Sequence, residues 1–388
     1  MTFFQFSVPT KIISDWGIAT DFAHECELMG ITDLLLVTDP GIQKLGLAEP
    51  IVDHLNENGI NVVGVFSEVP SDSSVEAVEA CADQAKVSGA KGFLALGGGS
   101  VIDTAKGANI LFSLGGSLKD DYAGAQTISQ TLAPLIAIPT TAGTGSEVTE
   151  AIVIYDHESQ SKLSFVDQHL LPTMAVLDPS LTQGLPPLLT AATAMDALTH
   201  AMEAMMSVQH GPFADALASS AIRLIKDHIL KAVEDGSDQN ARSALMTAAT
   251  LAGVAFNHAM VGVVHAVAHS VGAVAHIHHG LANAIFLPHG LAYNRPEASE
   301  RLLQIAKAWG IEGGKQQKVL DDLEREVQGL LEALHKSCDF PLSYQSAGAK
   351  AEQLERVIEL ACEDGAGFYN PRSLDATDLE PFVRRAFG

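Results

Sequence analysis

The chain has 388 residues, of which 47% are hydrophobic and 18% are charged, and its formal net charge is −24. This length exceeds the roughly 250–300 residues at which a single core stops growing, so two domains are expected. The negative charge argues against nucleic acid or an anionic membrane as a partner, because both would repel it. The apolar fraction is ample for a packed core and argues against disorder.

The cysteines and the first residues bear on the compartment. Four cysteines are scattered without a CxxC motif, which indicates neither a disulfide framework nor a thiolate zinc site. The N-terminal segment lacks the basic and apolar stretches of a signal peptide, and no apolar run has the length of a spanning helix. We therefore expect a cytoplasmic protein.

The first half of the chain alternates short apolar runs with polar stretches of helical spacing, such as 74–88. This alternation predicts a parallel α/β sheet, with ligands bound beyond the carboxyl ends of its strands. The four predicted buried strands are rich in aliphatic residues and end in Gly, Pro, Asp or Thr: 34–39, 62–66, 93–97 and 135–139. Two further runs, 152–155 and 174–177, are expected to extend or flank this sheet.

The second half has a different pattern. From about Thr190 the chain is rich in Ala, Leu, Met, Glu and Gln, and strand-like runs nearly vanish. This composition predicts an all-helical domain that begins near residues 180–186. We assign residues 1–182 to the α/β domain and residues 183–388 to the helical domain.

Two glycine-rich turns follow predicted strands. The first, Gly97 to Ser100, opens a predicted helix, and its glycines would let a phosphate approach backbone N–H groups. It is neither a Walker loop nor a GxGxxG motif, so a plain strand-to-helix turn is an alternative. The second, Pro139 to Glu147, holds six Gly, Ser or Thr among its nine residues. Two such turns on one side of a parallel sheet predict a dinucleotide site.

Asp39 ends an earlier predicted strand, where an acidic residue can hydrogen-bond the 2′-hydroxyl of a ribose. A carboxylate there would repel a 2′-phosphate, so this residue favours NAD over NADP. A helix N-cap is the alternative interpretation.

Histidines gather in the helical half. Asp196 and His200 are four residues apart, and so are His265 and His269, so each pair lies on one helix face. More histidines follow within 276–279. Any one of them, taken singly, fits an ordinary core residue or a solvated one. As a set among small apolar residues, three imidazoles and one carboxylate fit Fe(II), Zn, Mn, Co or Ni.

Four segments together resemble the iron-containing (group III) alcohol dehydrogenase family: 97–106, 139–147, 195–204 and 265–280. The resemblance implies a Rossmann-like dinucleotide-binding domain followed by a helical domain for metal and substrate. It also implies an NAD(H)-dependent enzyme that interconverts a small alcohol and its aldehyde or ketone. Its divalent metal would be Fe(II), with Zn(II) as an alternative, and the enzyme would be a homodimer.

By the same resemblance, the metal ligands would be Asp196, His200, His265 and His279. His279 is chosen because the family's last ligand precedes Gly and, two residues later, Ala-Asn. The family usually has Pro before this ligand, whereas this chain has His278, so the two adjacent imidazoles compete for the assignment. His269 matches a family histidine near the substrate and is the candidate catalytic residue, which would relay a proton.

The coenzyme site carried over from the family consists of residues from both turns and the earlier strand end: Asp39, Gly97, Gly98, Gly99, Ser100, Asp103, Thr140, Thr141 and Thr144. The family often has Asn-Pro where this chain has Ser71-Asp72, at the rim of the coenzyme site. Alternatives within the superfold are a maleylacetate reductase, a glycerol dehydrogenase or a sugar-phosphate cyclase. An alternative of another class is a non-catalytic protein that binds a metal or nucleotide.

Overall fold

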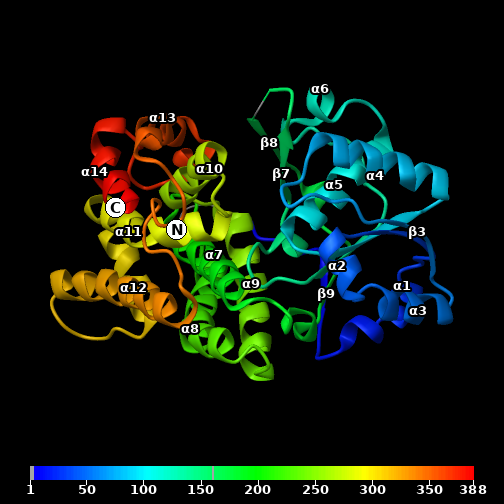
Figure 1. Ribbon diagram of the computed structural model, residues 1–388, viewed down its shortest axis with the longest axis horizontal. Helices are drawn as coiled ribbons and strands as arrows, with labels where there is room; N and C mark the ends of the chain where they lie inside the picture. Colours follow the sequence, from blue (N-terminus) through cyan, green and yellow to red (C-terminus); the bar gives the residue numbers. More distant parts are fainter. Residues whose placement is uncertain (1–3, 160) are drawn as a thin grey trace. The chain divides into compact units, whose positions relative to one another are not determined.

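The computed structural model describes residues 4–159 and 161–388, and these form two compact units (Figure 1). The α/β unit comprises residues 7–141 and 145–183, and the helical unit comprises 184–388 together with the short segments 4–6 and 142–144. The predicted boundary lies between 182 and 183, and the packing of 142–144 with the helices was not predicted.

A six-stranded parallel sheet forms the core of the α/β unit, with strand order β1-β9-β6-β4-β2-β3. Its strands are β1 (Lys11–Ser14), β2 (Asp33–Val37), β3 (Asn61–Phe66), β4 (Gly92–Gly97), β6 (Leu135–Pro139) and β9 (Met174–Leu177). The predicted parallel sheet is confirmed, and the run at 174–177 extends it. The edge strand β1 was not predicted.

Helices cover both faces of this sheet, which explains why its strands are continuously apolar. The helices of the unit are α1 (Ala23–Leu28), α2 (Pro40–Leu45), α3 (Glu49–Glu57), α4 (Val75–Ser88), α5 (Gly99–Leu114) and α6 (Leu118–Tyr122). On β2, Leu35 packs into a core shared with α4 and α5, whereas Leu34 and Leu36 pack into the opposite core with α1 and α3.

The predicted run 152–155 flanks the main sheet. It lies in β7 (Ala151–Asp156), which pairs antiparallel with β8 (Ser161–Val166) in a small sheet completed by β5 (Gly124–Ala125).

The helical unit is built around α7 (Pro187–Met206), whose residues from Thr190 to Met206 are all buried. The helices α8 (Pro212–Glu234), α9 (Gln239–Ala259) and α11 (His279–Trp309) pack against α7 (Figure 1). The remaining helices of the unit are α10 (Val263–Ala275), α12 (Gln316–Cys338), α13 (Leu354–Glu363) and α14 (Ala376–Phe387). Among the described residues, no single helix has both the length and the apolar character of a membrane span.

Candidate active site

Three loops meet at the carboxyl edge of the main sheet. The strands β2, β4 and β6 are neighbours in the sheet, and Gly97 at the end of β4 pairs with Pro139 at the end of β6. Because β3 and β4 lie on opposite sides of β2, the strand order reverses here, and α/β sheets bind ligands at such a point. The loops after these strands carry Asp39, the turn from Gly97 to Ser100, and Thr140.

The first glycine-rich turn has no space for larger residues at its start. A Cβ on Gly97 would lie 2.5 Å from Cγ2 of Val101, whereas one on Gly98 would meet Thr141 at an ordinary 3.5 Å. Gly98 is the N-cap of α5 and supplies no side-chain cap. The first N–H groups of this helix therefore remain available to an anion, as such helix ends commonly are.

Asp103, from the same motif, is engaged inside the α/β unit. One carboxylate oxygen accepts a hydrogen bond from Ser146 Oγ at 2.6 Å, and the other accepts from the Val153 N–H at 3.1 Å. Burial raises the pKa of this carboxyl, although the nearby Lys106 opposes the shift. Asp103 thus braces the second glycine-rich turn.

Asp39 is the N-cap of α2, as the alternative interpretation had it. Its Oδ1 accepts hydrogen bonds from the N–H groups of Gly41 at 2.7 Å and Ile42 at 3.0 Å. These bonds use one carboxylate oxygen and leave Oδ2 for another partner, so the N-cap and a bond to a ribose are compatible.

In the helical unit, α7 presents three ionisable side chains on one face. Asp196, His200 and Glu203 follow one another at intervals of four and three residues, and all three are buried. Buried charges and imidazoles are costly unless they are paired or bound to a metal. Asp196 and Glu203 contact residues at the start of α10 or α11, and His200 lies against the ring of His265.

The ligand atoms of Asp196, His265 and His279 converge within 4.8 Å of one another. Nε2 of His279 lies 3.5 Å, and Nε2 of His265 lies 3.9 Å, from Oδ1 of Asp196. Between them lies the amide of Asn283, whose Nδ2 is 2.7 Å from Asp196 Oδ1, 3.2 Å from His265 Nε2 and 3.0 Å from His279 Nε2. His278 is exposed and is not part of this group.

His200 lies directly beside this group without sharing its convergence point. Its ring stacks on that of His265 with centroids 4.6 Å apart, and its buried Nδ1 has no hydrogen-bond partner among the described residues. Burial is the main cause that lowers the pKa of His200 to about 4. A neutral imidazole with a free ring nitrogen is the form that binds a metal.

The charge of Asp196 is held by its neighbours. Burial by itself would raise the pKa of this carboxyl, but the surrounding imidazoles and the Asn283 hydrogen bond lower it to about 2. The carboxylate therefore stays ionised over the whole physiological range. An anionic oxygen, two converging imidazole nitrogens and the adjoining ring of His200 form a set that fits a divalent transition metal.

Gly280 explains why α11 can begin here. A Cβ at this position would lie 2.3 Å from the carbonyl oxygen of Ala192 and 3.4 Å from Cβ of Asp196. Only glycine lets the first turn of α11 lie against the backbone of α7, which brings His279 to Asp196.

Glu203, which the sequence analysis missed, joins α7 to the start of α10. Its carboxylate accepts hydrogen bonds from the Val264 N–H at 2.7 Å, the His265 N–H at 3.3 Å and His265 Nδ1 at 2.6 Å. Gly262 gives α10 no side-chain cap, so Glu203 and Asn370, which accepts from the Val263 N–H, take that place. A carboxylate on Nδ1 leaves Nε2 of His265 free for a metal.

His269, one turn further along α10, has a similar partner. Its Nδ1 lies 2.9 Å from Oδ2 of Asp364, a residue absent from the sequence analysis. Its ring stacks on that of His279 with centroids 5.4 Å apart and meets His265 edge-on at 5.9 Å. His269 thus adjoins the metal-fitting group without contributing a ligand atom to it.

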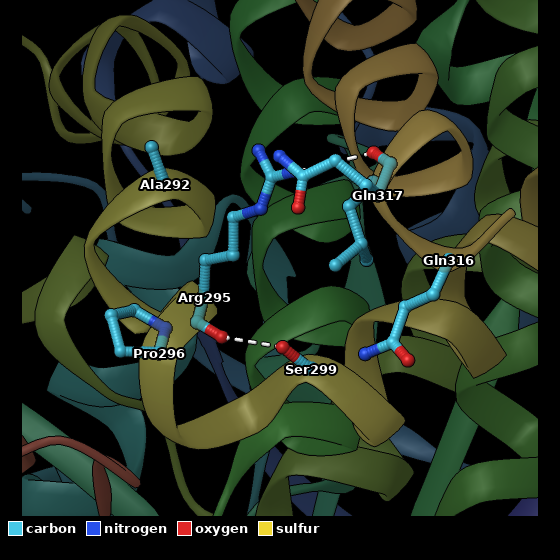
Figure 2. A pocket seen from close by; sticks show the side chains of 7 residues that line it. Ala292, Arg295, Pro296, Ser299, Gln316 and Gln317 are labelled. Carbon is cyan, nitrogen blue, oxygen red and sulfur yellow. Dashed lines mark hydrogen bonds between the residues drawn. The ribbon is translucent and has the colours of Figure 1, made fainter.

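A separate pocket of about 500 Å³ lies between α11 and α12 (Figure 2). Its cation, Arg295, is neutralised by Asp321 at 2.6 Å and Glu324 at 3.0 Å. None of the predicted site residues lines this pocket, so it is not the candidate active site.

A phosphate-compatible sheet edge and a buried carboxylate–imidazole group, within one chain, fit the class of metal-dependent, dinucleotide-linked oxidoreductases. Comparison with known families identifies the family within this class. Residues 9–179 match the model of the iron-containing alcohol dehydrogenases, and residues 190–387 match the model of the C-terminal part of that family.

Individual proteins agree with this result. The chain is 34% identical to the NAD-dependent methanol dehydrogenase of Bacillus methanolicus over 382 residues, which is 98% of this chain and 99% of that protein. It is also 34% identical to an NADPH-dependent butanol dehydrogenase of Clostridium saccharobutylicum, over 97% of this chain and 96% of that protein. A crystal structure of 1,3-propanediol oxidoreductase superposes with a TM-score of 0.94 and 35% identity, and the match covers 100% of both chains.

The chain belongs to the iron-containing alcohol dehydrogenase family. It is an oxidoreductase of the alcohol dehydrogenase class, and this prediction from the sequence is confirmed. The family resemblance read from the four segments is thereby confirmed.

Proposed function

We propose that Asp196, His265 and His279, together with His200, hold a divalent metal and that the chain interconverts a small primary alcohol and its aldehyde. Fe(II) is the proposed metal, and Zn(II) is the alternative, because imidazole suits both. The observation that carries this proposal is the convergence of the Asp196, His265 and His279 ligand atoms within 4.8 Å. The ring of His200, which stacks on that of His265 and has an unpartnered Nδ1, supports a fourth ligand.

The chain's residues prepare this site in three ways. Asp196 contributes a fixed negative charge, Glu203 keeps Nε2 of His265 free of a proton, and Gly280 brings His279 close to α7. A bound metal would supply Lewis acidity toward the substrate oxygen, and the nicotinamide would carry the hydride. His269, next to this group and partly exposed, would hold or release the hydroxyl proton.

For the coenzyme, we propose NAD(H) over NADP(H), bound along the carboxyl edge of the sheet. The support is Asp39, whose Oδ2 is available beside the switch point and whose charge would repel a 2′-phosphate. The N–H groups that open α5 and the hydroxyls of Thr140 and Thr141 would receive the diphosphate.

A homodimer and a cytoplasmic location complete the proposal. Light scattering tests the first, and cell fractionation tests the second.

The test uses adjacent histidines as a matched pair. His279→Ala should lower retained Fe(II) or Zn(II) to near the level of Asp196→Ala and reduce turnover of short aldehydes with NADH by about 100-fold or more. His278→Ala should retain both metal and activity, because His278 lies outside the convergent group. Metal content is measured by mass spectrometry after dialysis, and turnover by the absorbance of NADH.

Two results would contradict the proposal. Equal metal retention in the His279 and His278 variants would mean that the ligand set is wrong. Full activity in chelated, metal-free protein would mean that the chain works as a metal-independent reductase, the alternative represented by maleylacetate reductases.

A further inference from the structure

We propose that Asp364 is a positioning residue that fixes the tautomer of His269, so that Nε2 of this imidazole accepts and returns the substrate proton. This inference rests on the proposed function, because it assigns the proton to His269. It adds a residue from outside the histidine-bearing helices, located where α13 ends and the short 3-10 helix Gly365–Tyr369 begins.

The carboxylate of Asp364 is held at both oxygens. Oδ1 accepts a hydrogen bond from the Ala366 N–H at 2.8 Å, and Oδ2 faces Nδ1 of His269 at 2.9 Å. A backbone N–H can only donate, so Oδ1 must remain an acceptor and Oδ2 is left for the imidazole. The side chain of Asp364 is 20% exposed, which limits its freedom to rotate away.

This arrangement determines where the proton on the imidazole lies. An ionised carboxylate only accepts hydrogen bonds, so Nδ1 of His269 must carry the N–H. A neutral imidazole has one N–H, and Nε2 is therefore left with its lone pair. No hydrogen bond to Nε2 of His269 occurs among the described residues, so this nitrogen is available to a ligand.

A comparison one turn earlier on α10 shows what distinguishes this pair. His265 has the same arrangement, with Nδ1 on a carboxylate of Glu203 at 2.6 Å, but its side chain is only 3% exposed. The side chain of His269 is 33% exposed. A sealed imidazole suits a fixed metal ligand, whereas an open one can exchange a proton with substrate or water.

During alcohol oxidation, Nε2 of His269 takes the hydroxyl proton, and a bound NAD⁺ would accept the hydride of the carbinol C–H bond. The resulting imidazolium is stabilised by the Asp364 carboxylate, which stays ionised, and then releases the proton to water. Reduction of the aldehyde runs these steps in reverse, with the imidazolium as the donor.

Two substitutions separate positioning from structure. In Asp364→Asn, the amide oxygen still accepts the hydrogen bond from the Ala366 N–H, so the amide NH₂ faces Nδ1 of His269. Because this NH₂ group donates, Nδ1 must accept and the imidazole proton moves to Nε2. In Asp364→Ser, the hydroxyl can still cap the 3-10 helix, but nothing dictates the tautomer. We expect kcat to fall by about 100-fold or more in Asp364→Asn and by about tenfold in Asp364→Ser. A structural role predicts the opposite order, because Asn is closer in shape to Asp.

Two further measurements complete the experiment on the metal-loaded enzyme. The double variant Asp364→Asn/His269→Ala should be no slower than His269→Ala, because the first residue acts only through the second. Nitrogen NMR of histidine-labelled protein should detect Nδ1–H at His269 in the parent chain and Nε2–H in Asp364→Asn.

The outcomes distinguish this inference from the function on which it rests. If His269→Ala retains full kcat, the proton role fails and the positioning role fails with it. If His269→Ala is slow while Asp364→Asn is no slower than Asp364→Ser, the proton role stands and the positioning role is overturned. An unchanged tautomer in Asp364→Asn also overturns it.

Discussion

The sheet edge and the histidine group of this chain are built in opposite ways. At the sheet edge, backbone N–H groups and small residues form the candidate coenzyme site, and Gly97 leaves no space for a side chain. In the helical unit, charged and aromatic side chains form the site, and Asp196 and His265 are almost fully buried. Substitutions should therefore act through volume and charge at the sheet edge, and through lost hydrogen bonds and ligands in the helical unit.

The largest expected effect is a loss of metal affinity in the helical unit, on substitution of Glu203. Glu203→Ala removes the acceptor from His265 Nδ1 and should lower metal affinity by about 10–100-fold, the usual cost of losing a ligand's hydrogen-bond partner. Asn370→Ala is the control, because Asn370 caps the same end of α10 without touching His265. Equal losses of metal affinity, measured by competition with a chelator, would mean that Glu203 acts only as a helix cap.

Close backbone packing also occurs in the helical unit, at Gly280. Gly280→Ala should lower the free energy of unfolding by about 1–3 kcal/mol, because its Cβ would lie 2.3 Å from the Ala192 carbonyl oxygen. Metal retention should fall with it. Gly272→Ala is the control, since its Cβ has only an ordinary 3.7 Å contact and the change should stabilise α10 by about 0.5–1 kcal/mol. Urea unfolding of both variants measures the difference, and equal stabilities would contradict the expected clash.

A smaller effect, on coenzyme preference, is expected at Asp39, where the sheet edge presents a charged side chain. Asp39→Asn keeps the oxygen that caps α2 but removes the negative charge. The ratio of kcat/KM with NADH to that with NADPH should fall roughly tenfold, because a charged hydrogen bond contributes about 1.5 kcal/mol or more. Metal content should not change. An unaltered ratio would place coenzyme preference elsewhere.

The smallest effect concerns the opposite, amino edge of the same sheet. Hydrogen bonds, first from Lys91 and then from Asn61, lower the pKa of Asp33 from 3.8 to about 2. A depressed carboxyl pKa contributes stability that is present above pH 3.8 and is lost as the pH falls toward 2. Asp33→Asn should therefore be slightly less stable at neutral pH, with the difference closing below pH 4. Acid unfolding followed by circular dichroism measures this, and coenzyme affinity should stay unchanged.

Much of the fold could be predicted from the sequence because its signals are local. Strands such as 135–139 are aliphatic throughout, because helices cover both faces of their sheet. This composition distinguishes them from the helical half, which is rich in Ala, Leu, Met, Glu and Gln. The edge strand β1 escaped prediction because its residues, Lys11–Ser14, are largely exposed and carry little apolar pattern.

The candidate site was predictable only in part. The spacing of Asp196 and His200 reflects one helix, and Glu203 continues that spacing, so its signal was present but was not used. The choice between His278 and His279 depends on where α11 begins and on the contact at Gly280, which spacing does not contain. Asp364 lies 95 residues from His269, and nothing local marks a pairing over that distance.

The burial of α7 has a consequence for how sequence variation can be tolerated. An ordinary surface helix accepts polar residues on its outer face, so its tolerance to substitution rises and falls with each turn. On α7 every residue from Thr190 to Met206 is buried, so there is no outer face over these five turns or so. A saturation library of this chain should show one unbroken intolerant block there, and changes in substrate preference would have to arise from other segments.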